Sequence, residues 1–230
     1  MTLVLLAALG KSFLFVLAAI LPILNPAATA PIFLGLTESA SEQTRIQLAW
    51  RIARNMVVLM VASMLVGSYV LDFFGISLPI VRVGGGLIVA ATAWQLLTAT
   101  QETVERRTAL ADSFTPEQAR KQAFYPLTFP ISCGPGSIAA AITVGVALSA
   151  DKLALSLARM AGGVLAIITI GVILYFVFRY AQRLLKPLGE AGTIIFLRLS
   201  AFILLCLGVQ IIWDGLSELL RSLLLSAGIS

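Results

Sequence analysis

Residues 21–31 read LPILNPAATAP, and about 110 residues later residues 126–136 read PLTFPISCGPG. Each stretch lies in an apolar run long enough to span a bilayer, which takes about 20 residues. Proline removes a backbone donor and clashes with the preceding turn, so three prolines in each stretch predict a broken helix. In hydrocarbon the freed backbone groups are tolerated only where protein or water satisfies them. Broken spans in corresponding positions of two halves are typical of a secondary transporter's substrate site.

The composition indicates an integral membrane protein. Of 230 residues, 59% are hydrophobic and 12% charged, against about 25% charged in average proteins. The net charge of +5 does not indicate nucleic acid binding, because the basic residues are spread over loops, where membrane proteins use them for orientation. The chain has no histidine, the commonest metal ligand and proton relay. We therefore expect no metal, no cofactor and no enzymatic activity, with Cys133 and Cys206 as buried small hydrophobes.

Six spans emerge from the apolar runs. The chain up to residue 10 is expected to be an interfacial lead-in or the first turns of span 1. The polar connection at 99–123 contains Thr115 and Pro116, a pair typical of a helix start. The predicted spans are residues 12–36, 49–71, 77–98, 124–149, 154–178 and 192–213.

The basic residues predict the orientation of these spans. Ten of them fall on one side: Arg45, Arg51, Arg54, Arg106, Arg107, Arg120, Lys121, Arg179, Arg183 and Lys186. Four fall on the other side: Lys11, Lys152, Arg159 and Arg221. By the positive-inside rule the side with ten is cytoplasmic. Both termini then face away from the cytoplasm.

The last spans of the two halves also correspond. Arg82 is followed by Gln95 in one, Arg198 is followed by Gln210 in the other, and small residues after each arginine allow close helix packing. An odd number of spans per half inverts the second half. We therefore predict an all-α membrane protein with six transmembrane helices in a 3+3 inverted-topology repeat, helices 1 and 4 being broken. The first repeat is residues 1–98, the cytoplasmic linker 99–123 and the second repeat 124–230.

Asn25-Pro26 gives the sharpest site prediction. If the helix unwinds at residues 22–26 and restarts near Ala27, the restarted half-helix exposes amides that attract a carboxylate. Asn25 can cap this half-helix and also contact a ligand; the alternative is a proline kink with Asn25 as a structural cap. The hydroxyls in both stretches either contact substrate or bond a neighbouring backbone. The predicted substrate-binding residues are Asn25, Pro26, Ala27, Ala28, Thr29, Ser132, Cys133, Gly134, Gly136 and Ser137.

Arg82 and Arg198 are the only charges placed well inside the spans, and such groups suggest function. We expect both to point into the bundle, either as a gate or structural clamp or by binding a carboxylate. Gln95 and Gln210 are uncommon in spans and are assigned to the same group. No acidic residue lies at mid-span, so a sodium ion held by unwound carbonyls is a better candidate for coupling than a carboxylate proton relay.

These residues carry a family resemblance. Asn25-Pro26 with residues 31–37 (PIFLGLT), followed by residues 126–136, resembles the MarC family of bacterial inner-membrane proteins, part of the LysE-like exporter superfamily. The resemblance covers essentially the whole chain and implies six spans in the inner membrane. The family includes a small neutral amino acid transporter of the SnatA type, which implies such an activity here. Cys133 departs from the family pattern, where a small aliphatic residue is expected.

We therefore expect a transporter or exporter of small neutral amino acids such as glycine and alanine, with sodium coupling and a homo-oligomer left open and membrane lipids as surroundings. A thiol-electron carrier needs a reactive cysteine in each half, and the first motif has none. Metal-ion transport is disfavoured by the missing histidines and mid-span carboxylates. The broken spans contain only Phe33, Tyr125 and Phe129 as aromatic residues, which favours a small site over multidrug efflux. The alternatives are a non-transporting scaffold or efflux of other small solutes.

Overall fold

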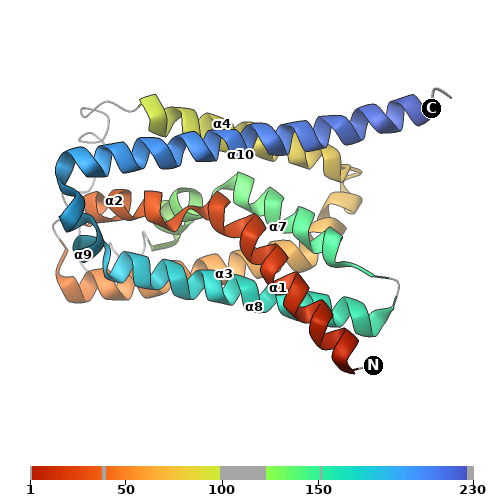
Figure 1. The fold of residues 1–230 in the computed structure, drawn as a ribbon, viewed down its shortest axis with the longest axis horizontal. Coiled ribbons are helices and arrows are strands. Elements are labelled where there is room, and N and C mark those ends of the chain that lie inside the picture. The colour runs from red at the N-terminus through yellow and green to blue at the C-terminus, as the bar shows by residue number, and fades with distance from the viewer. Residues whose placement is uncertain (1, 38–39, 99–122, 151, 227–230) are drawn as a thin grey trace.

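The chain folds into a bundle of helices (Figure 1). The computed structural model describes residues 2–37, 40–98, 123–150 and 152–226, and these ranges contain no strand. The all-helical prediction is therefore confirmed for the described residues. The elements are α1 (Thr2–Leu24), α2 (Pro26–Leu36), α3 (Glu42–Phe73), α4 (Leu78–Thr98), the π-helix η1 (Ala123–Ser132), α7 (Pro135–Leu148), α8 (Leu153–Arg179), α9 (Ala181–Leu185), the 3₁₀ turn η2 (Lys186–Leu188) and α10 (Gly189–Ser226).

Within the described ranges, five helical stretches are long and apolar enough to cross a membrane, and α7 is a shorter apolar helix. The helix α1 begins at Thr2, so residues 2–10 form its first turns. The helix start expected at Thr115 lies outside the described residues. The five stretches are Thr2–Leu34, Glu42–Phe73, Leu78–Thr98, Leu153–Arg179 and Ala191–Ser226.

Two pairs of long helices enclose the shorter elements. Figure 1 shows α4 beside α10 on one side of the bundle and α3 beside α8 on the other, with α2 and α7 between them. The helix α7 packs against both α3 and α4, and α2 packs against both α8 and α10. The short elements therefore join the two pairs, and a change in either would alter how the pairs meet.

Most of the apolar core lies among α1, α2, α3, η1, α7 and α8. Phe33 of α2 stacks on Phe178 of α8, with ring centroids 4.5 Å apart, and this contact fixes the far end of α2. A second, smaller cluster joins α4 and α10 through Val89, Ala93 and Leu204. The bundle thus has one large core and a smaller second cluster between α4 and α10.

Glycine lets the long helices approach closely. A Cβ on Gly208 of α10 would lie 2.7 Å from the Ala90 amide nitrogen of α4, and a Cβ on Gly86 would lie 2.9 Å from the Gly208 carbonyl oxygen. Such small-residue contacts are a principal source of packing between helices in lipid. The close packing expected from the small residues that follow Arg82 is therefore present at the α4–α10 interface.

Candidate functional site

The first interruption of the chain lies at Asn25, between α1 and α2. Asn25 has φ +42°, and no other non-glycine residue in the described ranges has a positive φ. Its amide still donates to the Leu21 carbonyl at 3.0 Å, while its own carbonyl accepts from the amides of Ala28 and Thr29. The Asn25 side-chain Oδ1 accepts from the Ala28 amide at 3.3 Å, which is the geometry of a helix N-cap.

Most other polar groups at this interruption are satisfied locally. The Thr29 hydroxyl donates to the Pro26 carbonyl at 3.1 Å, and the Thr37 hydroxyl donates to the Phe33 carbonyl at 2.7 Å. Pro26 and Ala28 are buried, whereas Ala27 is exposed. The threonines thus follow the backbone-bonding alternative, and Asn25 and Ala27 are the predicted residues here that keep accessible surface.

The second interruption lies at Gly134, between η1 and α7. Tyr125 and Phe129 have extended backbone angles inside η1, and the Cys133 amide donates five residues back to the Thr128 carbonyl at 2.8 Å. Gly134 has φ −84° and ψ 176°, which is extended backbone that any residue adopts. Pro135 starts α7 without a side-chain cap. The chain therefore enters α7 by a different route from the one it takes into α2.

The side chains at the second interruption are mostly buried. The hydroxyls of Thr128 and Ser132 donate to the carbonyls of Ala123 and Leu127, at 2.6 and 2.8 Å. The Cys133 side chain is fully buried in the large core, as expected of a small hydrophobe, whereas Cys206 is exposed on α10, contrary to the same expectation. The buried groups therefore hold the interrupted segment in place.

Gly136 and Ser137 open α7. We expected Gly136 to allow a backbone to approach a ligand, but the group beside it belongs to α4. A Cβ there would clash with the Val89 side chain and lie 3.1 Å from the Gly85 carbonyl oxygen. Ser137 is buried, and no hydrogen bond of its hydroxyl occurs among the described residues. Gly136 therefore lets α7 pack closely against α4, because there is no room for a side chain at this position.

The two interruptions lie near the middle of the bundle in Figure 1, and contacts between α1 and α7 and between α2 and η1 connect them. Both restarted helices begin with proline, which has no N–H, so the next residues, Ala27 and Gly136, carry the first amides. First-turn amides have no intrahelical acceptor, and a helix N-terminus carries a positive partial charge. The arrangement can therefore attract an anionic group.

Comparison with known proteins places the chain in a family. The model of the MarC family, described as MarC family integral membrane protein, matches residues 10–220. The chain belongs to the MarC family. It is 30% identical over 208 residues to the UPF0056 inner membrane protein MarC of Escherichia coli K12, and also to that of Shigella flexneri; each match covers 90% of this chain and 94% of the relative. No solved structure matches the chain significantly.

The two intramembrane arginines of this MarC-family chain have different surroundings. Arg82 of α4 forms an ion pair with Glu218 of α10, and 23% of its side chain remains exposed. Arg198 is exposed on α10, contrary to the expectation that it points into the bundle. The physical reason is that α10 packs through neighbouring positions, with Ala201 and Leu204 buried beside it. Arg82 therefore joins two helices, but its described partner is not a carbonyl freed by an interruption.

The two glutamines also lie on the surface of the bundle. Gln95 is exposed on α4, and Gln210 is exposed on α10, where its side-chain amide donates to the Asp214 carboxylate at 2.8 Å. Neither is buried beside the interruptions, contrary to the expectation that they reach a cavity. A polar residue within an apolar run does not by itself predict a buried side chain, because these helices present one face to their neighbours and another to the surroundings.

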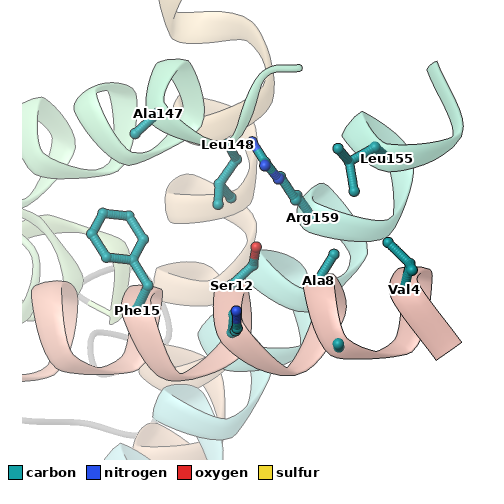
Figure 2. Close-up of a pocket in the computed structure, with 10 residues that line it drawn as sticks. Val4, Ala8, Ser12, Phe15, Ala147, Leu148, Leu155 and Arg159 are labelled. Carbon is teal, nitrogen blue, oxygen red and sulfur yellow. The ribbon is translucent and has the colours of Figure 1, made fainter. Parts of the chain in front are cut away.

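A pocket that we did not predict from the sequence lies at one end of the bundle (Figure 2). It has a volume of about 550 Å³ and contains none of the predicted site residues. One face of α1 carries Val4, Ala8, Lys11 and Phe15 at helical intervals, and this spacing was the only sign of the pocket in the sequence of α1. The residues that line it are Val4, Ala7, Ala8, Lys11, Ser12, Phe15, Ala147, Leu148, Leu155 and Arg159.

Proposed function

We propose that this chain is a secondary transporter, not an enzyme, that moves small neutral amino acids such as glycine and alanine across the inner membrane. The substrate site is formed where α1 meets α2 and where η1 meets α7. The observation that carries the proposal is the pair of connected interruptions, each followed by a helix whose first amide comes after a proline. Interrupted helices of this kind hold the substrate in several transporter folds.

The proposed architecture has six crossings in a 3+3 inverted repeat, with η1 and α7 together as the fourth. The contact pattern supports it. Exchanging the two sets of three crossings turns the α1–α8 contact into the η1–α3 contact and the α2–α10 contact into the α7–α4 contact, both of which exist. The same exchange swaps the two members of the α3–α8 pair and of the α4–α10 pair, so each of these contacts corresponds to itself. Such self-consistency is expected of a pseudo-two-fold axis in the membrane plane.

The proposed orientation places both termini in the periplasm. Figure 1 has the start of α3 and the end of α8 at one end of the bundle, and the start of α1 and the end of α10 at the other. Arg45, Arg51, Arg179 and Arg183 belong to the first end, while Lys11 belongs to the second. This asymmetry favours a cytoplasmic position for the first end.

The proposed chemistry uses backbone amides more than side chains. The amides of Ala27 and Gly136 attract the substrate carboxylate, and the Asn25 side-chain nitrogen donates to the substrate while its oxygen caps α2. The residues buried around the interruptions include Ala28, Ala30 and Cys133, and the substrate proposed for this site has a short side chain. Unwound carbonyls are the proposed ligands of a sodium ion, if sodium drives transport.

A non-transporting scaffold is the second candidate. The observation that favours it is the local satisfaction of the hydroxyls of Thr29, Thr128 and Ser132, each of which donates to a nearby backbone carbonyl. A purely structural kink needs no more than this. The two candidate functions differ in whether the Asn25 side chain contacts a substrate in addition to capping α2.

Counterflow of labelled alanine in proteoliposomes distinguishes the two. We expect wild type to accumulate alanine, with glycine competing and with leucine and ethylamine not competing. Asn25→Gly keeps the positive φ without cost and removes the side chain, so we expect it to reduce counterflow roughly ten-fold, as loss of one charge-assisted hydrogen bond would. Asn55→Ala in α3 is the matched control and should transport normally. Folded wild type that exchanges no small amino acid under sodium and proton gradients would support the scaffold.

A further inference from the structure

The pocket at the end of the bundle where α1 begins has walls from three helices. The helix α1 contributes Val4, Ala8 and Phe15, and the end of α7 and the start of α8 contribute other apolar side chains. Figure 2 shows Arg159 extending from α8 between Leu148 and Leu155, with the α1 side chains along the opposite wall. Phe15 is 49% exposed. The pocket is therefore an open, mainly apolar groove that contains charged groups.

Its polar groups are predominantly cationic. Lys11 and Arg159 line it together with the Ser12 hydroxyl, and none of the described residues in the lining is acidic. The other two basic residues assigned to this side of the membrane, Lys152 and Arg221, do not line it. Two of the four basic residues assigned to this side thus line one apolar groove, and this charge distribution complements an anion that carries apolar groups.

The depth of the groove matches the lipid headgroups. The helix α8 has 27 residues and is about 40 Å long, close to the 40–45 Å or so of a bilayer with its headgroups. Arg159 lies six residues after Leu153, the first residue of α8, or about 9 Å along the axis. That places its backbone near the edge of the hydrocarbon, from which a long basic side chain reaches the phosphate level.

We infer that this groove binds one anionic phospholipid, with the phosphate held between Lys11 and Arg159 and the acyl chains against Val4, Phe15 and Leu155. A volume of about 550 Å³ is much more than a small amino acid fills and is in the range of pockets for larger ligands. The apolar walls stabilise acyl chains and offer nothing to a zwitterion such as alanine. The bound lipid connects α1, α7 and α8 at the end of the bundle opposite α9.

The test uses purified full-length protein in detergent micelles doped with phosphatidylglycerol or with phosphatidylcholine, and native mass spectrometry to count retained lipid. A basic residue near an anionic lipid surface strengthens binding roughly five-fold. We therefore expect Lys11→Gln and Arg159→Gln each to reduce phosphatidylglycerol retention about five-fold, and the double variant about 30-fold. Phosphatidylcholine should be retained poorly by every variant.

Three further variants separate this site from general electrostatics and from misfolding. Lys152→Gln removes the same charge at the same end of the bundle and should retain phosphatidylglycerol normally. Arg159→Lys keeps the charge and should also retain it. Phe15→Ser removes an apolar wall at a half-exposed position and should weaken retention, although no charge changes.

Several results would overturn the inference. Equal retention by wild type and the double variant would do so, as would equal loss from Lys152→Gln, or equal binding of phosphatidylcholine and phosphatidylglycerol by wild type. Displacement of the lipid by millimolar inorganic phosphate would identify a small-anion site instead. Displacement by millimolar alanine would identify an outer station of the transport pathway. Alanine counterflow is measured separately, so failure of the transporter proposal leaves the lipid result unaffected.

Discussion

The two interruptions have corresponding sequence positions but differ in chemistry. At the first, a polar side chain in a left-handed conformation caps α2, and the following Ala27 is exposed. At the second, Gly134 has an ordinary extended backbone, α7 has no side-chain cap, and the following Gly136 is buried against Val89. The first interruption therefore keeps Asn25 and Ala27 accessible, whereas the second uses its small residues to bring helices together.

This difference shows that a repeated motif need not have a repeated role. Pro26 and Pro135 start their helices in the same way, because proline suits the first turn. The residues around them favour an accessible polar side chain at the first interruption and packing at the second. Under the proposed function, substrate selectivity depends mainly on the first interruption, and the second supplies an amide and a fixed framework.

The largest expected effect is at Gly136. Gly136→Leu inserts a side chain where even a Cβ clashes with Val89, so we expect a loss of about 3 kcal/mol or more of stability and poor recovery of folded protein. Ala27→Leu is the matched change after the first proline and should be tolerated, because Ala27 is exposed. Fluorescence-detected size-exclusion thermal melts of both variants measure the difference. Equal destabilisation by Gly136→Leu and Ala27→Leu would contradict the conclusion that Gly136 is packed against α4 while Ala27 is accessible.

The next effect is at the two positions that precede the prolines. Asn25→Ala loses the cap and keeps an unfavourable positive φ, each costing about 1 kcal/mol. Asn25→Gly relieves the φ and should cost only a few tenths of a kcal/mol. Gly134→Ser meets an ordinary extended backbone and provides a cap, so we expect no loss or a small gain. A Gly134→Ser variant as unstable as Asn25→Ala would contradict the stated backbone difference.

The smallest expected effect is at the arginines. Arg82→Gln breaks a partly exposed ion pair with Glu218 and should lower stability by at most about 1 kcal/mol. Arg198→Gln should change nothing measurable, because Arg198 is exposed. A double-mutant cycle of Arg82→Gln and Glu218→Gln in thermal melts gives the coupling energy. A coupling of zero would show that this pair does not join α4 to α10.

The sequence predicted an all-helical fold, because helices depend on local apolar runs. It missed the start of α3, which begins at Glu42 after the Ser41 cap and not at residue 49. The predicted unwinding over residues 22–26 was too wide, because α1 continues through Pro22 to Leu24, Pro31 lies inside α2, and Asn25 alone separates the two helices. Helix ends were less accurate. The helix α10 continues to Ser226, well past the predicted limit at 213, because leucine-rich turns extend it without a breaker.

The surroundings of individual side chains were not predictable in the same way. Arg82 and Arg198 have similar places in the sequence, yet only Arg82 has an ion pair among the described contacts. The direction of a helical side chain depends on which face its helix buries, and that is a tertiary property. The groove at Lys11 and Arg159 was hidden for a related reason, since its walls come from helices far apart in the chain.

Alkylation of a cysteine at Ala27 tests the central claim most directly. In a Cys206→Ser background, with the buried Cys133 retained, Ala27→Cys should react with a maleimide from its exposed position. We expect millimolar alanine or glycine to slow this reaction several-fold, ethylamine to leave it unchanged, and Gln43→Cys at the exposed polar start of α3 to react at one rate throughout. Alkylation of Ala27→Cys at the same rate with and without alanine, in protein that still exchanges alanine, would place the substrate elsewhere.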